Sequence, residues 1–154
     1  MKFTAREDIE APLEFVFDQA ADFSGFERSA MRRGADVQRT DGGSAIVVGA
    51  AWRVQFRFRG KDRVLEPRIE RLDRPNGYAV RSISGGLESD LTVDLVQLSP
   101  NRTRMQVELE LAPKSLSARL MVQSMKLAKS TLSRRFEKRV AQYAQEIEER
   151  RSQA

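Results

Sequence analysis

The sequence predicts an α+β fold in which an antiparallel curved sheet of about seven strands wraps around a long C-terminal helix. After Pro113 the 154-residue chain contains no glycine and no proline, and its apolar residues recur every three or four positions. Before Pro113 most of the chain alternates apolar and polar residues in short runs separated by turn residues. Because neither a helix nor a sheet can bury its apolar side alone, we expect the helix to lie across the sheet.

The first part of the chain predicts one strand followed by two short helices. Residues 2–10 alternate with the period of a half-buried strand, and Ala11-Pro12 ends that strand. Residues 12–22 predict a helix, because proline is tolerated in a first helical turn and apolar residues follow at helical spacing. Residues 25–33 predict a second short helix, which Gly34 ends.

Six further strands are expected before the C-terminal helix. They are residues 36–40, 44–59, 63–73, 78–84, 87–98 and 103–111. The turn Asp41-Gly42-Gly43-Ser44 separates the first two, and residues 44–59 show the clearest alternation in the chain. Pro67 predicts a sheet edge or a bulge within the third of them. Short turns between consecutive strands predict an antiparallel meander.

The C-terminal segment predicts one helix of about nine turns, with Ser115 or Ser117 as its N-cap. One apolar stripe runs along it, formed by Ala118, Met121, Met125, Ala128, Leu132, Phe136, Val140, Tyr143 and Ile147. We find no repeat, low-complexity tract or linker, so we expect residues 1–154 to form a single domain.

Composition excludes several classes of chemistry. The chain has no cysteine and no histidine, which excludes thiolate nucleophiles, Ser-His and Cys-His pairs and the usual zinc and haem ligands. We therefore expect no metal and no cofactor. Residues 1–10 lack the apolar core of a signal peptide, and no stretch approaches the roughly 20 apolar residues of a membrane span. We expect a soluble cytoplasmic protein.

Several short sequence segments, together with this order of elements, are similar to those of a known group of proteins. The segments are Ala11-Pro12 followed by Val16-Phe17 and Asp22, the strand break at residues 66–68, the strand end at residues 81–86, and the helix after Pro113. With them the chain resembles the START-like (SRPBCC) helix-grip superfamily, in its lipid-transport and polyketide cyclase/dehydrase-like branch. The resemblance covers nearly the whole chain. These segments are turn and packing signatures, so they specify the fold better than the activity.

The resemblance implies a hydrophobic cavity between the sheet and the long helix, closed at one end by the short helices. Members bind lipids, quinones, hormones or polyketides, and a minority catalyse cyclisation or dehydration. Inward positions of the predicted strands and helices then give the expected cavity lining: Phe26, Trp52, Val54, Phe56, Tyr78, Val80, Leu91, Val93, Met105, Val107, Leu109, Met121, Met125 and Leu132. Methionine is flexible and polarizable, which suits both an adaptable binding surface and an ordinary core.

No catalytic residue is predicted. Glu7, Tyr78 and Tyr143 are single candidates for acid–base chemistry, and none has a partner at an identifiable spacing. A glutamate at the rim of the sheet, and tyrosines whose hydroxyls reach water or a backbone carbonyl, are the better explanation.

The excess of basic residues leaves two interpretations open. The formal net charge is +5, and eight basic residues but only one acidic residue lie between Lys114 and Arg139. A solvated helix face is the expectation, because Lys126, Lys129, Arg134, Arg135 and Lys138 run around more than one side of the helix. The alternative is a surface that contacts an acidic partner or an anionic membrane. Nucleic acid is not expected, since strict alternation puts aromatic rings and arginines on opposite faces of the strand around Trp52.

Three functional hypotheses follow. The leading one is the binding or transport of a hydrophobic small molecule or lipid, without covalent chemistry. The second is a polyketide cyclase/dehydrase-like enzyme, and the third is an interaction module that docks through its basic helix. The sequence does not predict the oligomeric state.

Overall fold

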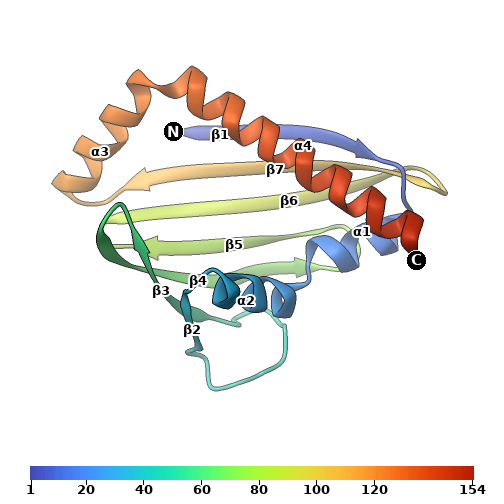
Figure 1. Cartoon of the computed structure of the whole chain (residues 1–154), viewed down its shortest axis with the longest axis horizontal. Coiled ribbons are helices and arrows are strands. Elements are labelled where there is room, and N and C mark those ends of the chain that lie inside the picture. Colours follow the sequence, from blue (N-terminus) through green and yellow to red (C-terminus); the bar gives the residue numbers. More distant parts are fainter.

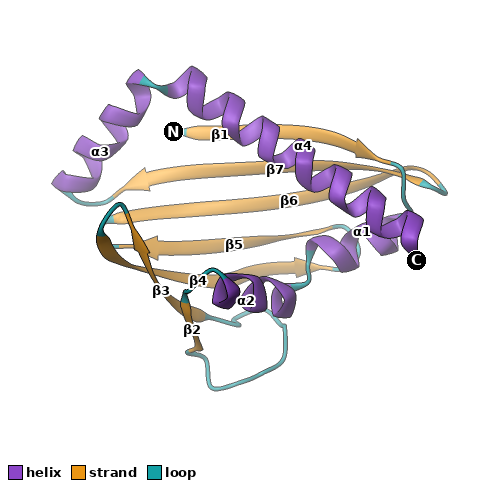
Figure 2. Ribbon diagram, in the orientation of Figure 1, coloured by secondary structure: helices purple, strands orange, loops and turns teal.

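A seven-stranded antiparallel sheet and four helices make up the computed structural model, which describes residues 1–154 (Figure 1). The strands are β1 (Lys2–Ile9), β2 (Asp36–Arg39), β3 (Trp52–Phe58), β4 (Lys61–Asp73), β5 (Gly77–Ser84), β6 (Leu87–Ser99) and β7 (Arg102–Pro113). The helices are α1 (Leu13–Ala20), α2 (Phe23–Arg32), α3 (Leu116–Leu127) and α4 (Lys129–Gln153). Figure 2 shows the helices gathered along one side of the strands. The predicted α+β fold class is confirmed.

The strands follow the order β1-β7-β6-β5-β4-β3-β2. From β2 to β7 each strand pairs with the next one in the chain, which is the predicted meander, and β1 adds at the edge beside β7. The β1–β7 register places Phe3 opposite Leu109 and Ile9 opposite Thr103. Ile9 and Thr103 are fully buried, and the Thr103 hydroxyl donates a hydrogen bond to the carbonyl of Ala11 at 2.9 Å. This contact fixes the turn from β1 into α1.

Helix α4 lies along β1 and its C-terminal end reaches α1 (Figure 1). It buries Val140, Ala144 and Ile147, so the second half of the predicted apolar stripe faces the core. The hydroxyl of Tyr143 donates to the carbonyl of Gln19 at 3.1 Å, which ties α4 to the end of α1. No helix has both the length and the apolar composition needed to cross a membrane.

The predicted single nine-turn helix is wrong at Ala128, where the chain bends and separates α3 from α4 (Figure 1). Ala128 has φ −109° and ψ 20°, and its N–H donates to the carbonyl of Met125, three residues back. Alanine is the strongest helix former, so periodicity and propensity give no sign of this break. Packing accounts for it: α3 buries Ala118 and Val122 and contacts β7, whereas α4 runs along β1.

The predicted strand at residues 44–59 is also corrected, because only β3 is regular and residues 40–51 form an irregular connection. Gly49 has φ +91°, in the left-handed region that glycine adopts readily, and its N–H donates to the carbonyl of Ile69. The Ile69 N–H in turn donates to the carbonyl of Ala50, so only two backbone hydrogen bonds join the segment to β4, and Val47 and Val48 are exposed.

Pro67 lies inside the sheet, since β4 pairs with both β3 and β5. The register between β4 and β5 shifts between Ile69 and Arg71, so the predicted bulge is present three residues after the proline. Two helix starts have side-chain caps. Asp22 accepts a hydrogen bond from the Gly25 N–H at 3.0 Å, and Ser115, one of the two predicted caps, accepts from Ala118 at 3.1 Å.

Candidate ligand-binding cavity

Helix α2 places one face against the inner side of the sheet. Phe23, Phe26, Glu27 and Ala30 follow the spacing i, i+3, i+4 and i+7, so their side chains share that face. The helix is held at its start by the Asp22 cap and contacts β2 further along. It covers the end of the sheet that α4 does not reach (Figure 1).

A cavity of about 340 Å³ lies between α2 and strands β2 to β6. Ten of its thirteen lining residues are hydrophobic. The lining consists of Phe23, Phe26, Glu27, Ala30, Val37, Trp52, Val54, Leu65, Pro67, Tyr78, Val80, Ser82 and Leu91. A concave, mainly apolar space with a few polar groups has the character of a small-molecule site.

Aromatic rings form one wall of the cavity, with Phe23 at their centre. Its ring stacks on Trp52 at a centroid distance of 5.8 Å, and it meets the edges of Tyr78 at 5.0 Å and Phe26 at 5.6 Å. Phe23, Trp52 and Tyr78 are buried, whereas Phe26 is partly exposed. The contact with Phe26 lies within α2, and the contacts with Trp52 and Tyr78 attach α2 to the sheet. The rings therefore hold this wall in a defined geometry.

Glu27 is the only charged residue in the lining. Its Oε1 accepts a hydrogen bond from the indole Nε1–H of Trp52 at 2.6 Å. Arg39 lies over the Trp52 ring at 5.0 Å from the centroid, but its guanidinium is held by Asp41, with both contacts at 2.8 Å. The cavity therefore presents apolar walls and a single carboxylate.

A second hollow of about 220 Å³ lies beside the first, under α4. It is lined by Ala20, Tyr78, Leu91, Val93, Met105, Val107, Arg139, Val140 and Tyr143. Tyr78 and Leu91 line both spaces, so the two hollows adjoin at these side chains.

The hydroxyls of the two tyrosines in these hollows make hydrogen bonds to the backbone. Tyr78 donates to the carbonyl of Ala20 at 2.8 Å, and Tyr143 donates to that of Gln19 at 3.1 Å. Burial raises the pKa of Tyr78 above its ordinary value and raises the pKa of Tyr143 to about 12. Both hydroxyls keep their protons at neutral pH, and both protons point at backbone carbonyls. Glu7, the third candidate, lies on β1 opposite Met105 and lines neither hollow.

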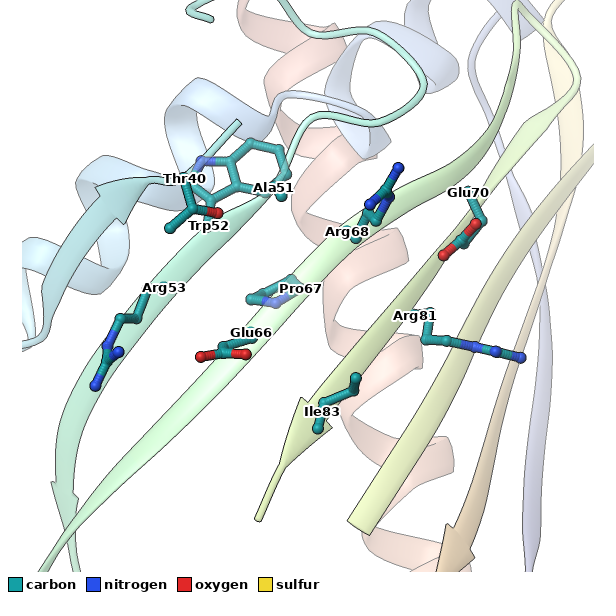
Figure 3. Close-up of a pocket in the computed structure, with 10 residues that line it drawn as sticks. All are labelled: Thr40, Ala51, Trp52, Arg53, Glu66, Pro67, Arg68, Glu70, Arg81 and Ile83. Atoms are coloured by element: carbon teal, nitrogen blue, oxygen red, sulfur yellow. The ribbon is translucent and has the colours of Figure 1, made fainter. Parts of the chain in front are cut away.

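A third hollow, of about 300 Å³, opens on the outer face of the sheet, and in Figure 3 the helices lie behind its strands. Half of its ten lining residues are charged: Arg53, Glu66, Arg68, Glu70 and Arg81. Arg81 is also paired with Asp90 at 3.0 Å. Alternating charges on an exposed sheet face are well solvated, and this hollow lacks the apolar walls of the cavity under α2. No three histidine, cysteine, aspartate or glutamate residues lie close enough together to hold a metal ion.

The structure distributes the fourteen predicted lining residues over several places. Six line the cavity under α2: Phe26, Trp52, Val54, Tyr78, Val80 and Leu91. Val93, Met105 and Val107 line the hollow under α4. The remaining five line neither space: Phe56, Leu109, Met121, Met125 and Leu132.

The bend at Ala128 explains the position of the two helical methionines. Because α3 turns away from the direction of α4 (Figure 1), Met121 is exposed, Met125 is half-buried, and neither lines the cavity. Phe56 lies near the end of β3 in a separate hollow with Arg57, Asp62 and Arg63. The aromatic side of β3 therefore contributes to the cavity only through its first residues.

Seven lining residues were not predicted: Phe23, Glu27, Ala30, Val37, Leu65, Pro67 and Ser82. The sequence contains a signal for the first two. Phe23 follows the helix cap Asp22, and Glu27 stands at i+4 from Phe23, where an apolar residue would be expected on a buried helix face. An acidic residue on an otherwise apolar helix face is a candidate for a buried hydrogen bond or for contact with a ligand.

Comparisons with known proteins show the fold. No protein-family model matches the sequence, and no curated protein matches it. Among solved structures, protein TTHA0849 from Thermus thermophilus has a TM-score of 0.65 at 16% identity, covering 96% of this chain and 97% of that one. The Zhui aromatase/cyclase from Streptomyces sp. R1128 has a TM-score of 0.64 at 15% identity, covering 97% and 94%.

A START superfamily protein from Mycobacterium smegmatis is similar over 89% of this chain and 97% of its own, with a TM-score of 0.54 and 13% identity. The chain thus has the helix-grip fold of START-like proteins, as the sequence resemblance predicted.

Proposed function

We propose that this protein binds a hydrophobic small molecule or a lipid in the cavity between α2 and the sheet. The observation that carries the proposal is a space of about 340 Å³ whose walls are hydrophobic at ten of thirteen residues. That volume is at the lower end of the range for small-molecule sites, about 300–1,000 Å³. The ligand, or the part of it that enters, is therefore the size of a two- or three-ring compound or a short acyl segment.

Burial of apolar surface supplies the binding energy in this proposal. A flat ring system of about 200 Å² yields roughly 5 kcal/mol at 25 cal/mol per Å², before the cost of immobilising the ligand. The rings of Phe23, Trp52 and Tyr78 are held together by their contacts with one another. A wall that is arranged in advance reduces the ordering cost of binding.

The hollow under α4 extends this site. Because Tyr78 and Leu91 line both spaces and Tyr78 is held by its hydrogen bond to Ala20, a rotation of Leu91 would connect the two spaces and lengthen the site toward Met105. Methionine accommodates varied shapes, which suits a site that takes ligands of different length. One of the proteins with a similar fold is an aromatase/cyclase, which is consistent with a small-molecule site in this chain. The expected cytoplasmic location stays a prediction.

Native mass spectrometry tests the proposal directly. We expect the gently purified protein either to carry an apolar compound that organic solvent extracts, or to form a one-to-one complex with an added naphthalene-type dye. A protein that carries nothing and binds the dye only in proportion to its concentration, without saturation, would contradict the proposal.

A second candidate function is docking on an anionic membrane, and exposed leucines on α3 favour it. Leu116, Leu120 and Leu127 are 74%, 59% and 92% exposed, and their spacing of four and seven residues aligns them along the helix. A water-exposed row of large apolar side chains is unusual on a folded protein and marks an interaction site.

The positive charge around α3 favours an anionic partner. From Lys114 to Phe136 the chain contains six basic residues and no acidic one. Arg119, Lys126 and Lys129 are exposed beside the leucine row. The basic residues alone did not favour a membrane, but basic side chains flanking an apolar helix face match the pattern of helices that lie in the interface of anionic bilayers.

Vesicle co-sedimentation tests this second function. We expect binding to anionic vesicles at low salt, no binding to neutral vesicles, and loss of binding as the Debye length shortens to about 8 Å at physiological salt. Leu120→Ser with Leu127→Ser should weaken binding. Val96→Ser is the control. Val96 is 57% exposed, and it lies near the end of β6 that is opposite to the end beside Pro113 and α3. A double variant that binds vesicles like the wild type, or a wild type whose leucine row pairs two copies into a dimer, would contradict it.

A further inference from the structure

Glu27 differs from the other carboxylates that accept a hydrogen bond from a side chain in this protein. Asp8, Asp41 and Asp90 each lie within 3.0 Å of an arginine, whereas Glu27 has no arginine or lysine partner. Its single hydrogen bond comes from the Trp52 indole to Oε1. A carboxylate has about four acceptor positions on its two oxygens, so Glu27 keeps acceptor capacity that the protein does not use.

The cavity that Glu27 lines contains no basic side chain. The whole chain carries 27 lysine and arginine residues and a formal net charge of +5, yet none of them lines the cavity under α2. Arg39, which lies over the Trp52 ring, is engaged by Asp41 and by the carbonyl of Ala45. Arg39 is near enough to attract Glu27, but it is already paired with Asp41 and does not line the cavity, so the cavity side of Glu27 has no basic side chain.

The aromatic wall favours the same kind of ligand. Faces of aromatic rings attract cations through their quadrupole. The two faces of Trp52 are already occupied by Phe23 and by the Arg39 guanidinium, so the ring faces that remain for a ligand cation belong to the other aromatic residues of the wall. Four aromatic residues line the space that contains the carboxylate: Phe23, Phe26, Trp52 and Tyr78. A protonated amine bound there would meet a carboxylate acceptor and ring faces together, while the rest of the molecule fills the apolar walls.

We propose that Glu27 selects the ligand, so that the cavity prefers an apolar compound carrying a protonated amine over a neutral or acidic compound of the same shape. This inference rests on the proposed ligand-binding function and names the chemical class of its ligand. The alternative is that Glu27 serves only as the acceptor for Trp52. The two explanations differ in what happens when the charge is removed and the acceptor is kept.

Glu27→Gln makes that change, because the glutamine carbonyl can still accept from Trp52. The probes are naphthylmethylamine, naphthylmethanol and naphthoate, which share one ring system and differ in charge. Each is titrated against a neutral naphthalene-type dye bound to the protein. Glu137→Gln on α4 is the matched control, since Glu137 is exposed and does not line the cavity, and the same charge is removed.

We expect wild type and Glu137→Gln to bind the amine about tenfold or more tightly than the alcohol, and the alcohol more tightly than the carboxylate. In Glu27→Gln the preference for the amine should disappear while the dye still saturates. A Glu27→Gln protein that binds the dye and retains the full amine preference would overturn the inference. Equal binding of the three probes by the wild type would overturn it too. Failure of the dye to saturate on the wild type would instead count against the proposed function itself.

Discussion

Phe23 at the start of α2 stacks on Trp52 of β3, with the ring centroids 5.8 Å apart and the planes inclined by 22°. This contact joins the helix to the sheet at the wall of the cavity. Trp52 is the only tryptophan in the chain, so its fluorescence reports on one place. Any ligand that enters under α2, and any movement of α2 away from the sheet, should change the emission of Trp52.

Replacing Ile147 tests which part of the C-terminal segment belongs to the core. Ile147→Ala should lower the free energy of unfolding by about 2–5 kcal/mol, because Ile147 is fully buried on α4. Leu127→Ala should change it by less than about 0.5 kcal/mol, since Leu127 is almost fully exposed next to the bend. Chemical denaturation measures both. Equal losses would mean that Leu127 is packed and that the segment is one straight helix.

Phe136 connects the first turns of α4 to β1. Its ring lies 5.9 Å from that of Phe3, and the side chain is half-buried. Phe136→Ala should cost about 2–4 kcal/mol, below the full range for a buried phenylalanine. Lys138→Ala, on the exposed side of the same helix, should cost less than about 0.5 kcal/mol. If denaturation curves for the two variants coincide, the face of α4 assigned to the sheet is wrong.

Asp41 makes stability depend on pH. The Arg39 guanidinium, through its hydrogen bonds, holds the pKa of Asp41 well below its usual range, and the Ala51 N–H adds to this at 3.3 Å. A carboxyl whose pKa is depressed by folding stabilises the protein above its unfolded pKa of about 3.9, and this contribution is lost progressively as the pH falls below that value.

Asp41→Asn should therefore be less stable than the wild type near neutral pH, and the difference should shrink as the pH falls below about 4. Urea denaturation at several pH values measures the difference. A difference that stays constant from neutral pH down to pH about 2 would show that the ionised carboxylate of Asp41 does not stabilise the fold.

Much of the fold could be predicted because its determinants are local. Period-two alternation and short turns define β4 to β7, and a meander follows when consecutive strands are joined by short turns. Ser115 is a capping residue directly before an apolar run, so the start of α3 could be placed, whereas the sequence pattern assigns the cap Asp22 to the end of the preceding helix and predicts the start of α2 two residues late. The stripe from Phe136 to Ile147 faces the core because α4 keeps one direction along the sheet.

The bend at Ala128 could not be predicted, because it depends on how α3 and α4 pack on different strands and not on a helix-breaking residue. The irregular segment before β3 was missed since Ile46, Val48 and Ala50 happen to alternate like a strand. The carboxylate in the cavity was missed because apolar periodicity gives no weight to an acidic residue on a helix face. Glu27 shares its helix face with Phe23, and only the paired sheet shows that this face is covered.

The most direct measurement of the central claim is a dye titration on a cavity-filling pair of variants. Leu91 of β6 lines both hollows, whereas Leu98 of the same strand is exposed and lines neither. Leu91→Phe adds volume inside the site, and Leu98→Phe adds the same volume outside it. We predict that the wild type and Leu98→Phe bind one naphthalene-type dye per chain with the same affinity, with a matching change in Trp52 emission, and that Leu91→Phe binds it about tenfold or more weakly. Identical titrations for the three proteins would contradict the assignment of this cavity as the binding site.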